Sequence, residues 1–329
     1  MKAPLFWKNK NSLYGVLLSP FGALYRLITS QRERFTITTK IRIPVICVGN
    51  IVLGGTGKTP ITIMIASALK EQGFNVHILS RGYGGKLKGP LLVDPFYHTA
   101  QEVGDEPLLL AQATSTWISK NKAEGAKAAT QAGAEILILD DGLQNPSLYK
   151  NFSIIVVNGE YGLGNERVFP AGPLRETVES GLKKANIIMI MGKDNHSLEK
   201  RWQGICPIFH GDLDPYINDI QALKNKPIYA FAGIGHPEKF FAMLHNYGLH
   251  VIAEKAFPDH YSFKSRDLDK LRAHADQLKA QLVTTEKDFL RLPHDMRQKV
   301  KIIRAHVTLK EKNLFSNLIH KVVPHEKKN

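Results

Sequence analysis

The chain has 329 residues, of which 43% are hydrophobic and 22% are charged. This length fits two modest domains better than one ordinary core, and the composition excludes a disordered chain. Cys47 and Cys206 are its two cysteines, each in or beside apolar sequence, which argues against a disulfide framework and a cysteine-based zinc site. The net charge of +14 indicates polyanionic partners such as nucleic acid, anionic lipid or phosphorylated substrates.

The N-terminal segment, residues 1–42, carries eight basic residues and one acidic residue, so it holds half of the net positive charge. Within it, residues 12–28 are uncharged except for Arg26. A bilayer span needs roughly 20 apolar residues, and Pro20 interrupts this shorter stretch. We therefore predict an amphipathic helix associated with an anionic membrane surface. The alternative is a helix that caps the domain core.

Short apolar runs alternate with helical stretches from Pro44 to Met191. Continuous apolar runs are typical of strands that are buried on both faces of a parallel sheet. We expect strands at 44–49, 75–80, 89–94, 134–140, 152–158 and 185–191, and helices at 60–73 and 121–133. The pattern predicts a doubly wound α/β domain of the P-loop NTPase kind, residues 43–192.

The regular pattern weakens at 193–226, which we interpret as a connector. A second, smaller α/β domain is predicted at 227–329. Its expected strands are 227–233, 249–257, 281–288 and 301–309, and its expected helices are 237–248, 265–280 and one near 314–323.

The stretch GGTGKTP, Gly54–Pro60, lies between a predicted strand and a predicted helix. A strand, a glycine-rich turn and a helix N-terminus together make a phosphate-binding loop. In such a loop Lys58 reaches the nucleotide phosphates and the Thr59 hydroxyl ligates Mg²⁺. Val52 replaces the first glycine of the full pattern, but three glycines remain free to adopt positive φ. The predicted ATP-binding residues are Val52, Leu53, Gly54, Gly55, Thr56, Gly57, Lys58, Thr59 and Gln144.

An acidic pair, Asp140 and Asp141, directly follows a predicted strand. Two adjacent carboxylates repel each other unless a cation is near, and a phosphate loop requires an acidic partner for Mg²⁺. We therefore predict a magnesium site here, without deciding which of the two touches the metal. The alternative is a capping pair in a surface turn. Gln144 is a candidate to orient a nucleophile or a phosphate.

Two further polar groups have no assigned chemistry from their pattern alone. Asp105 and Glu106 stand at the start of a predicted helix, where acids complement the macrodipole. His260 lies in FPDHYSF, a polar cluster inside aromatic sequence.

Taken together, the motifs resemble those of one family, the tetraacyldisaccharide 4'-kinases of lipid A biosynthesis. They are VGNIVLGGTGKTP, LSRGYGG, VGDEP, DDGLQ, NERVFPAGPLRE, AGIGHPEKFF, FPDHY and TEKD, in this order. The resemblance covers nearly the whole chain, and that family's phosphate loop also has the G-G-x-G-K-T form.

This resemblance implies transfer of the ATP γ-phosphoryl group to the 4'-hydroxyl of a tetraacylated glucosamine disaccharide 1-phosphate, which gives lipid IVA. It implies that Asp105 is the catalytic base, supported by His260, and that Lys58 is the third catalytic residue. The implied metal residues are Thr59, Asp140, Asp141 and Glu176, and the implied substrate residues are Arg81 and Arg175. The implied location is the cytoplasmic face of the inner membrane, because the acyl chains keep the substrate in the bilayer.

Three alternatives remain at this point. A P-loop switch NTPase would act through a partner, but guanine-specific switches carry an N-K-x-D element that the sequence lacks. A nucleic-acid-binding ATPase is disfavoured because the basic excess lies beside an apolar helix, so we expect no nucleic-acid partner. A soluble small-molecule kinase would have no use for residues 12–28. The sequence leaves the oligomeric state open, with a monomer as the expectation.

Overall fold

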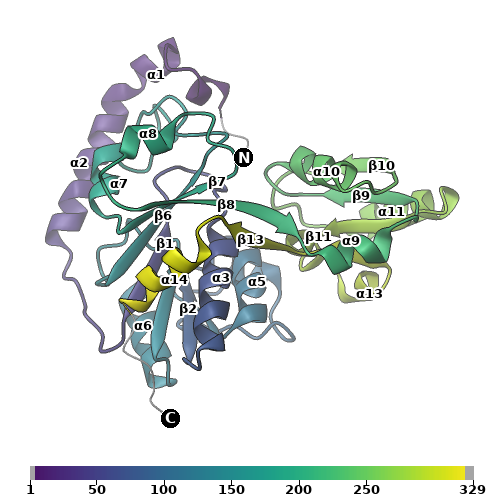
Figure 1. Ribbon diagram of the computed structural model, residues 1–329, viewed down its shortest axis with the longest axis horizontal. Coiled ribbons are helices and arrows are strands. Elements are labelled where there is room, and N and C mark those ends of the chain that lie inside the picture. The colour runs from purple at the N-terminus through teal and green to yellow at the C-terminus, as the bar shows by residue number, and fades with distance from the viewer. Residues whose placement is uncertain (1–3, 323–329) are drawn as a thin grey trace.

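The computed structural model of the protein describes residues 4–322. Residues 1–3 and 323–329, which belong to the two predicted terminal segments, lie outside this part. The described chain forms a larger unit on a nine-stranded sheet and a smaller unit on a four-stranded sheet (Figure 1). The predicted α/β fold with a second, smaller α/β unit is thus confirmed.

The larger unit is a mixed, mostly parallel sheet covered by helices. Its strands are β1 Val45–Gly49, β2 Val76–Ser80, β3 Leu91–Leu92, β4 Thr116–Ile118, β5 Ile136–Asp140, β6 Phe152–Asn158, β7 Ile187–Met191, β8 Ile208–Pro215 and β13 Ala305–Leu309. Its helices are η1 Leu5–Lys8, α1 Leu13–Leu17, α2 Ser19–Phe35, α3 Lys58–Glu71, α4 Ala100–Val103, α5 Asp105–Ala113, α6 Lys122–Gln131, α7 Val178–Lys183, α8 Leu198–Trp202 and α14 Lys312–His320.

The strand order β13-β8-β7-β6-β1-β5-β2-β4-β3 fixes where a ligand can bind. All neighbours are parallel except β13 with β8 and β3 with β4. Strand β1 lies between β5 and β6, so the chain leaves it toward one side of the sheet and later returns on the other. In open α/β sheets, such a point leaves a crevice at the carboxyl ends of the strands, where ligands bind.

The central strands form because their sequences are apolar on both faces. All five residues of β1 and of β7 are buried, and successive side chains point to opposite sides. Ile46 and Val48 of β1 pack in the cluster that contains Ile61 and Ile65 of α3. Val45 and Cys47 pack in the cluster on the other face. The sheet therefore separates two hydrophobic layers.

The smaller unit is a parallel four-stranded sheet in the order β10-β9-β11-β12. Its strands are β9 Ile228–Ala232, β10 Val251–Ala256, β11 Gln281–Thr285 and β12 Val300–Ile303. Its helices are α9 Ile217–Leu223, α10 Pro237–Asn246, α11 Ser265–Gln277, α12 Glu286–Phe289 and α13 His294–Arg297.

The structure corrects the expected boundaries at two places. Strand β8 lies inside the range 193–226 that the sequence predicts as a connector, and it joins the larger sheet beside β7. The predicted strand 301–309 divides into β12 of the smaller sheet and β13 of the larger one. The chain therefore crosses between the units twice. The sequence gives no local signal for β8 or for the division of 301–309. The polar residues of β8 mask its strand pattern, and its antiparallel partner β13 lies far away along the chain.

The packing of the C-terminal helix α14 allows a test of the assignment of β8 and β13 to the larger unit. Phe315 is 4% exposed, and its ring meets Phe209 of β8 edge-on at a centroid distance of 5.4 Å. Phe315→Ala should destabilise the larger unit by about 3–5 kcal/mol, because it leaves a cavity in the core. Hydrogen exchange should then lose protection in β7 and β8 but not in β9. Phe241→Ala, in the smaller core, should do the reverse. Loss of protection in β9 after Phe315→Ala would contradict the assignment.

Candidate active site

The phosphate loop connects the carboxyl end of β1 to the first turn of α3. Gly57 has a φ of 90°, in the left-handed region that residues with a Cβ rarely adopt, so the turn favours glycine. Asn50 shapes the loop because its Nδ2 donates to the carbonyl of Val52 at 2.7 Å and to Thr56 Oγ1 at 3.2 Å. The N–H groups at the start of α3 then face the crevice, which is the arrangement that binds phosphate.

Val52 has a structural reason to replace the expected glycine. Its side chain is 9% exposed and packs in the core beside Leu174, with which it forms an antiparallel bridge. The next residue, Leu53, donates its N–H to the carbonyl of Pro173 at 2.8 Å. The first half of the loop is therefore held by the Pro173–Leu174 segment, whereas its second half depends on glycine.

The two adjacent carboxylates after β5 lie in different environments. Asp140 is 4% exposed and accepts from Thr62 Oγ1 at 3.3 Å. Burial raises the pKa of Asp140 to about 6. Asp141 accepts two hydrogen bonds from Arg175, at 2.8 and 3.0 Å, and lies 3.8 Å from Lys58 Nζ. Burial alone would raise the pKa of Asp141, but Lys58 and Arg175 outweigh it and hold that pKa below its usual value.

Glu176, predicted near the metal, is engaged by protein donors on both oxygens. Its Oε1 accepts from Gln144 at 3.0 Å, and its Oε2 accepts from Ser180 at 2.8 Å and Lys184 at 2.7 Å. Gln144 also donates to the carbonyl of Asn50 at 2.7 Å. Through Gln144, this network holds Asn50, the residue at the start of the phosphate loop. Of the predicted metal carboxylates, Asp140 is the one without a cationic side chain bound directly to it within the described chain.

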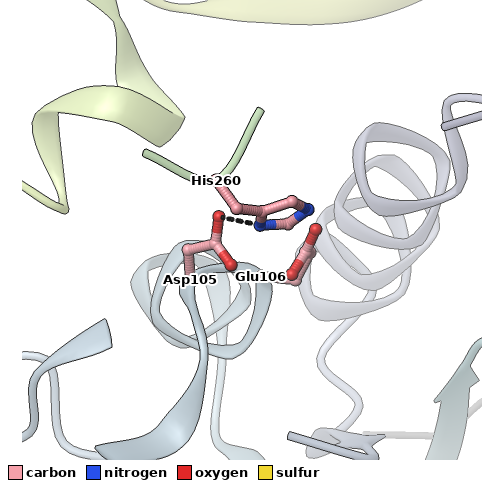
Figure 2. A group of neighbouring side chains, drawn as sticks. All are labelled: Asp105, Glu106 and His260. Carbon is pink, nitrogen blue, oxygen red and sulfur yellow. Dashed lines mark hydrogen bonds and ion pairs between the residues drawn. The ribbon is translucent and has the colours of Figure 1, made fainter. Parts of the chain in front are cut away.

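The predicted pair of Asp105 and His260 is brought together across the two units. Asp105 is the first residue of α5, and His260 lies between β10 and α11 of the smaller unit. His260 Nδ1 is 3.1 Å from Asp105 Oδ2 (Figure 2). The side chain of Asp105 is 7% exposed and that of His260 is 39% exposed. The two side chains, 155 positions apart in the sequence, therefore form one polar cluster.

Two cations that the sequence does not predict complete this cluster. Lys287 Nζ lies 2.6 Å from Glu106 Oε1 and 3.5 Å from Asp105 Oδ2, and Arg291 contacts Asp105 directly. Both residues are in or just after α12, beside the TEKD motif. Their spacing of four places them on one side of a helical turn, but no pattern in the sequence shows that their partners lie in the other unit.

A cleft of about 3250 Å³ connects these groups and extends to helix α2. The predicted site residues that line it are Val52, Leu53, Gly54, Gly55, Thr56, Gly57, Lys58, Thr59, Arg81, Asp140, Asp141, Gln144, Arg175, Glu176 and His260. Asp105 lies beneath this surface, behind His260. The phosphate loop, the acidic pair and His260 therefore line one cleft.

The buried Asp140 should cost the ligand-free protein stability. Because its pKa is raised to about 6, the penalty is present above this pH and disappears as the pH falls toward the ordinary aspartate value. Asp140→Asn should therefore raise the free energy of unfolding by about 2–3 kcal/mol near neutral pH. Urea unfolding should show a much smaller gain near pH 4.5. Asp141→Asn, which removes an ion-paired carboxylate, should destabilise instead. An equal gain for Asp140→Asn at both pH values would contradict this reading.

Comparison with known proteins identifies the family. The family model described as tetraacyldisaccharide-1-P 4'-kinase matches residues 14–323. The tetraacyldisaccharide 4'-kinase of Rhodospirillum centenum is 44% identical, over 97% of this chain and 96% of that protein. That of Rhodospirillum rubrum is 42% identical, over 98% of both chains. The crystal structure of LpxK from Aquifex aeolicus in complex with ATP superposes with a TM-score of 0.78 at 28% identity, covering 94% of this chain and 100% of that one. The chain therefore belongs to the tetraacyldisaccharide 4'-kinase family and is an ATP-dependent kinase.

Proposed function

We propose that the cleft transfers the γ-phosphoryl group of ATP to the 4'-hydroxyl of tetraacyldisaccharide 1-phosphate, which yields lipid IVA. The observation that carries the proposal is that the phosphate loop and His260, the partner of Asp105, line one cleft, although His260 comes from the smaller unit. Phosphoryl transfer needs positioning and charge neutralisation more than covalent chemistry. The switch-NTPase alternative is disfavoured by the family of the chain.

The triphosphate would lie on the N-terminus of α3, with Lys58 beside it. Burial lowers the pKa of Lys58, although Asp141 opposes this effect. Thr59 and Asp140 fit a Mg²⁺ ion, because both offer oxygen atoms and Asp140 is a buried carboxylate without a bound cationic side chain in the described chain. Bound Mg²⁺ would neutralise charge on the phosphates. Arg175 holds Asp141 in place, and its buried Nε has no partner in the described chain.

Asp105 would accept the proton of the sugar hydroxyl, with His260 as its partner. A positioned base contributes typically about 10²–10⁴-fold to a reaction of this kind. His260 lines the cleft and is anchored to Asp105, so substrate and base would meet at this wall. Arg81 also lines the cleft. Its guanidinium would suit a phosphate group of the substrate.

The N-terminal helices would bring the enzyme to its lipid substrate. Helix α2 packs closely on the larger unit at Gly22, where an added Cβ would lie 2.9 Å from the carbonyl oxygen of Val168. The ring of Tyr25 also packs against Phe169. Most large apolar side chains of α1 and α2 are exposed instead: Leu13, Tyr14, Val16, Leu17, Phe21, Leu24, Leu27, Ile28 and Phe35. Among residues 4–322, no helix has the length and hydrophobicity that crossing a bilayer requires.

An exposed apolar face flanked by basic residues suits the surface of an anionic membrane. The same cleft that holds the phosphate loop is also lined by Tyr25, Arg26 and Leu27 of α2. A lipid whose acyl chains stay in the bilayer could therefore present its sugar to the site. We accordingly propose that the protein works at the cytoplasmic face of the inner membrane, where ATP is available.

Removing either member of the Asp105–His260 pair should affect turnover rather than nucleotide binding. We expect Asp105→Asn and His260→Ala each to lower kcat by about 10²–10⁴-fold, with little change in the Kd for ATP. Transfer from γ-labelled ATP to the purified lipid measures turnover, and calorimetry measures binding. His245→Ala is the control, because His245 pairs with Glu254 on the surface of the smaller unit. Wild-type turnover in both site variants would remove the proposed base.

Membrane binding should depend on the exposed face of α2. Leu24 and Leu27 are 53% and 55% exposed, so the double change Leu24→Glu with Leu27→Glu should spare the fold. It should weaken binding to phosphatidylglycerol-containing vesicles by roughly tenfold or more, because it replaces apolar contact with repulsion. Leu314→Glu, on the 56% exposed Leu314 of α14, is the matched control. Undiminished vesicle binding by the double variant would contradict the proposed surface.

A further inference from the structure

Arg291 joins the two units at the proposed base. It follows α12 in the smaller unit, and its side chain is 5% exposed. On one edge, its Nη1 donates to the carbonyl of Gly233 at 2.8 Å and to Asp288 Oδ1 at 2.9 Å. On the other edge, Nε donates to Asp105 Oδ2 at 2.9 Å, and Nη2 contacts the same oxygen. One guanidinium thus bridges its own unit to the carboxylate of the larger unit.

The frame that holds Arg291 also holds His260. The carbonyl of Gly233, at the end of β9, accepts the backbone N–H of His260 at 3.1 Å as well as Arg291 Nη1. Asp288 is fully buried and accepts from the Gly233 N–H at 3.0 Å and from Thr285 Oγ1 at 2.8 Å. The smaller unit therefore fixes His260 and Arg291 from one point, and both side chains reach Asp105.

The charged groups that face Asp105 converge on one of its two oxygens. His260 Nδ1, Lys287 Nζ and the Arg291 guanidinium all approach Oδ2. Glu106 is the neighbouring acid, and Lys287 lies between the two carboxylates, where it supplies the cation that such a pair needs. Burial alone would raise the pKa of Asp105, but His260, Lys287 and Arg291 outweigh it, so the carboxylate stays ionised.

We propose that Arg291 is a positioning residue for phosphoryl transfer. Its hydrogen bonds to Oδ2 of Asp105 set the orientation in which Oδ1 receives the proton of the sugar hydroxyl. This inference rests on the base proposed above. A guanidinium is planar and donates along two fixed directions, and here Nε and Nη2 both bind Oδ2, so they fix the position of that oxygen. Because Cβ of Asp105 is held by the backbone of α5, the position of Oδ2 in turn determines where Oδ1 lies. An ammonium at the same place supplies charge without this orientation. The effect on catalysis should therefore depend on the shape of the side chain and not only on its charge.

The test compares Arg291→Lys with Arg297→Lys in the full-length protein. Arg297 is the matched control: it lies near Arg291 in the chain but donates to the carbonyls of Leu290 and Leu292. We expect Arg291→Lys to lower kcat for the lipid by roughly 10²-fold, as misplacement of a reacting group does, with the KM for ATP unchanged. Arg297→Lys should stay within about threefold of wild type for kcat.

A comparison of Asp105→Asn with the double variant Asp105→Asn, Arg291→Lys separates a positioning role of Arg291 from a general structural role. If Arg291 acts through Asp105, its change should cost less than about threefold once the carboxylate is gone, because groups that act as a unit are not additive. An equal cost in both backgrounds, or a kcat for Arg291→Lys near wild type, would overturn the inference. Wild-type turnover by Asp105→Asn would instead reject the base itself.

A second variant keeps the test decisive if Arg291→Lys does not fold. Asp288→Asn with Arg291→Gln removes one negative and one positive charge from the buried network, so it leaves no additional unpaired charge. When Asp105 is intact, this double variant should lower kcat by the same factor and leave the KM for ATP unchanged. A kcat near that of wild type would overturn the inference.

Discussion

The N-terminus of α3, held at the carboxyl end of β1, is the constraint on which the site depends. Strand β1 lies between β5 and β6, so the crevice opens where its chain turns into the phosphate loop. Gly57 permits the left-handed turn into the helix, and the Gln144–Glu176 network braces the loop from below. Because backbone N–H groups make this cradle, its geometry follows from the sheet rather than from flexible side chains.

The smaller unit supplies the side chains that surround Asp105. The carboxylate of Asp105 stands at the start of α5 in the larger unit, but its partners His260, Lys287 and Arg291 all come from the smaller one. The Asp105–Arg291 pair is the most deeply buried of these contacts, and a buried charge pair is sensitive to the loss of either partner. If Asp105 is the base, as we propose, the reaction requires both units in contact, whereas the phosphate loop lies within the larger unit alone.

How much the sequence predicts depends on how local each feature is. The phosphate loop and the acidic pair after β5 were predictable, because adjacent residues carry both signals. Strand β8 was not predicted, because its polar residues mask the apolar pattern. Strand β13 was not predicted either, because an edge strand is defined by its partner, and β8 lies far away along the chain. The roles of Lys287 and Arg291 were missed for the same reason. The Asp105–His260 contact was expected only through resemblance to a family, since no spacing rule connects two units.

We propose that one cleft binds ATP at the phosphate loop and the lipid sugar beside His260. The most direct measurement is a transfer assay with the purified full-length chain, γ-labelled ATP, Mg²⁺ and tetraacyldisaccharide 1-phosphate. We expect label on the lipid at its 4'-position, and we expect transfer to be lost when a chelator removes the metal. ATP binding without any transfer of label to this lipid, or label at another hydroxyl, would contradict it.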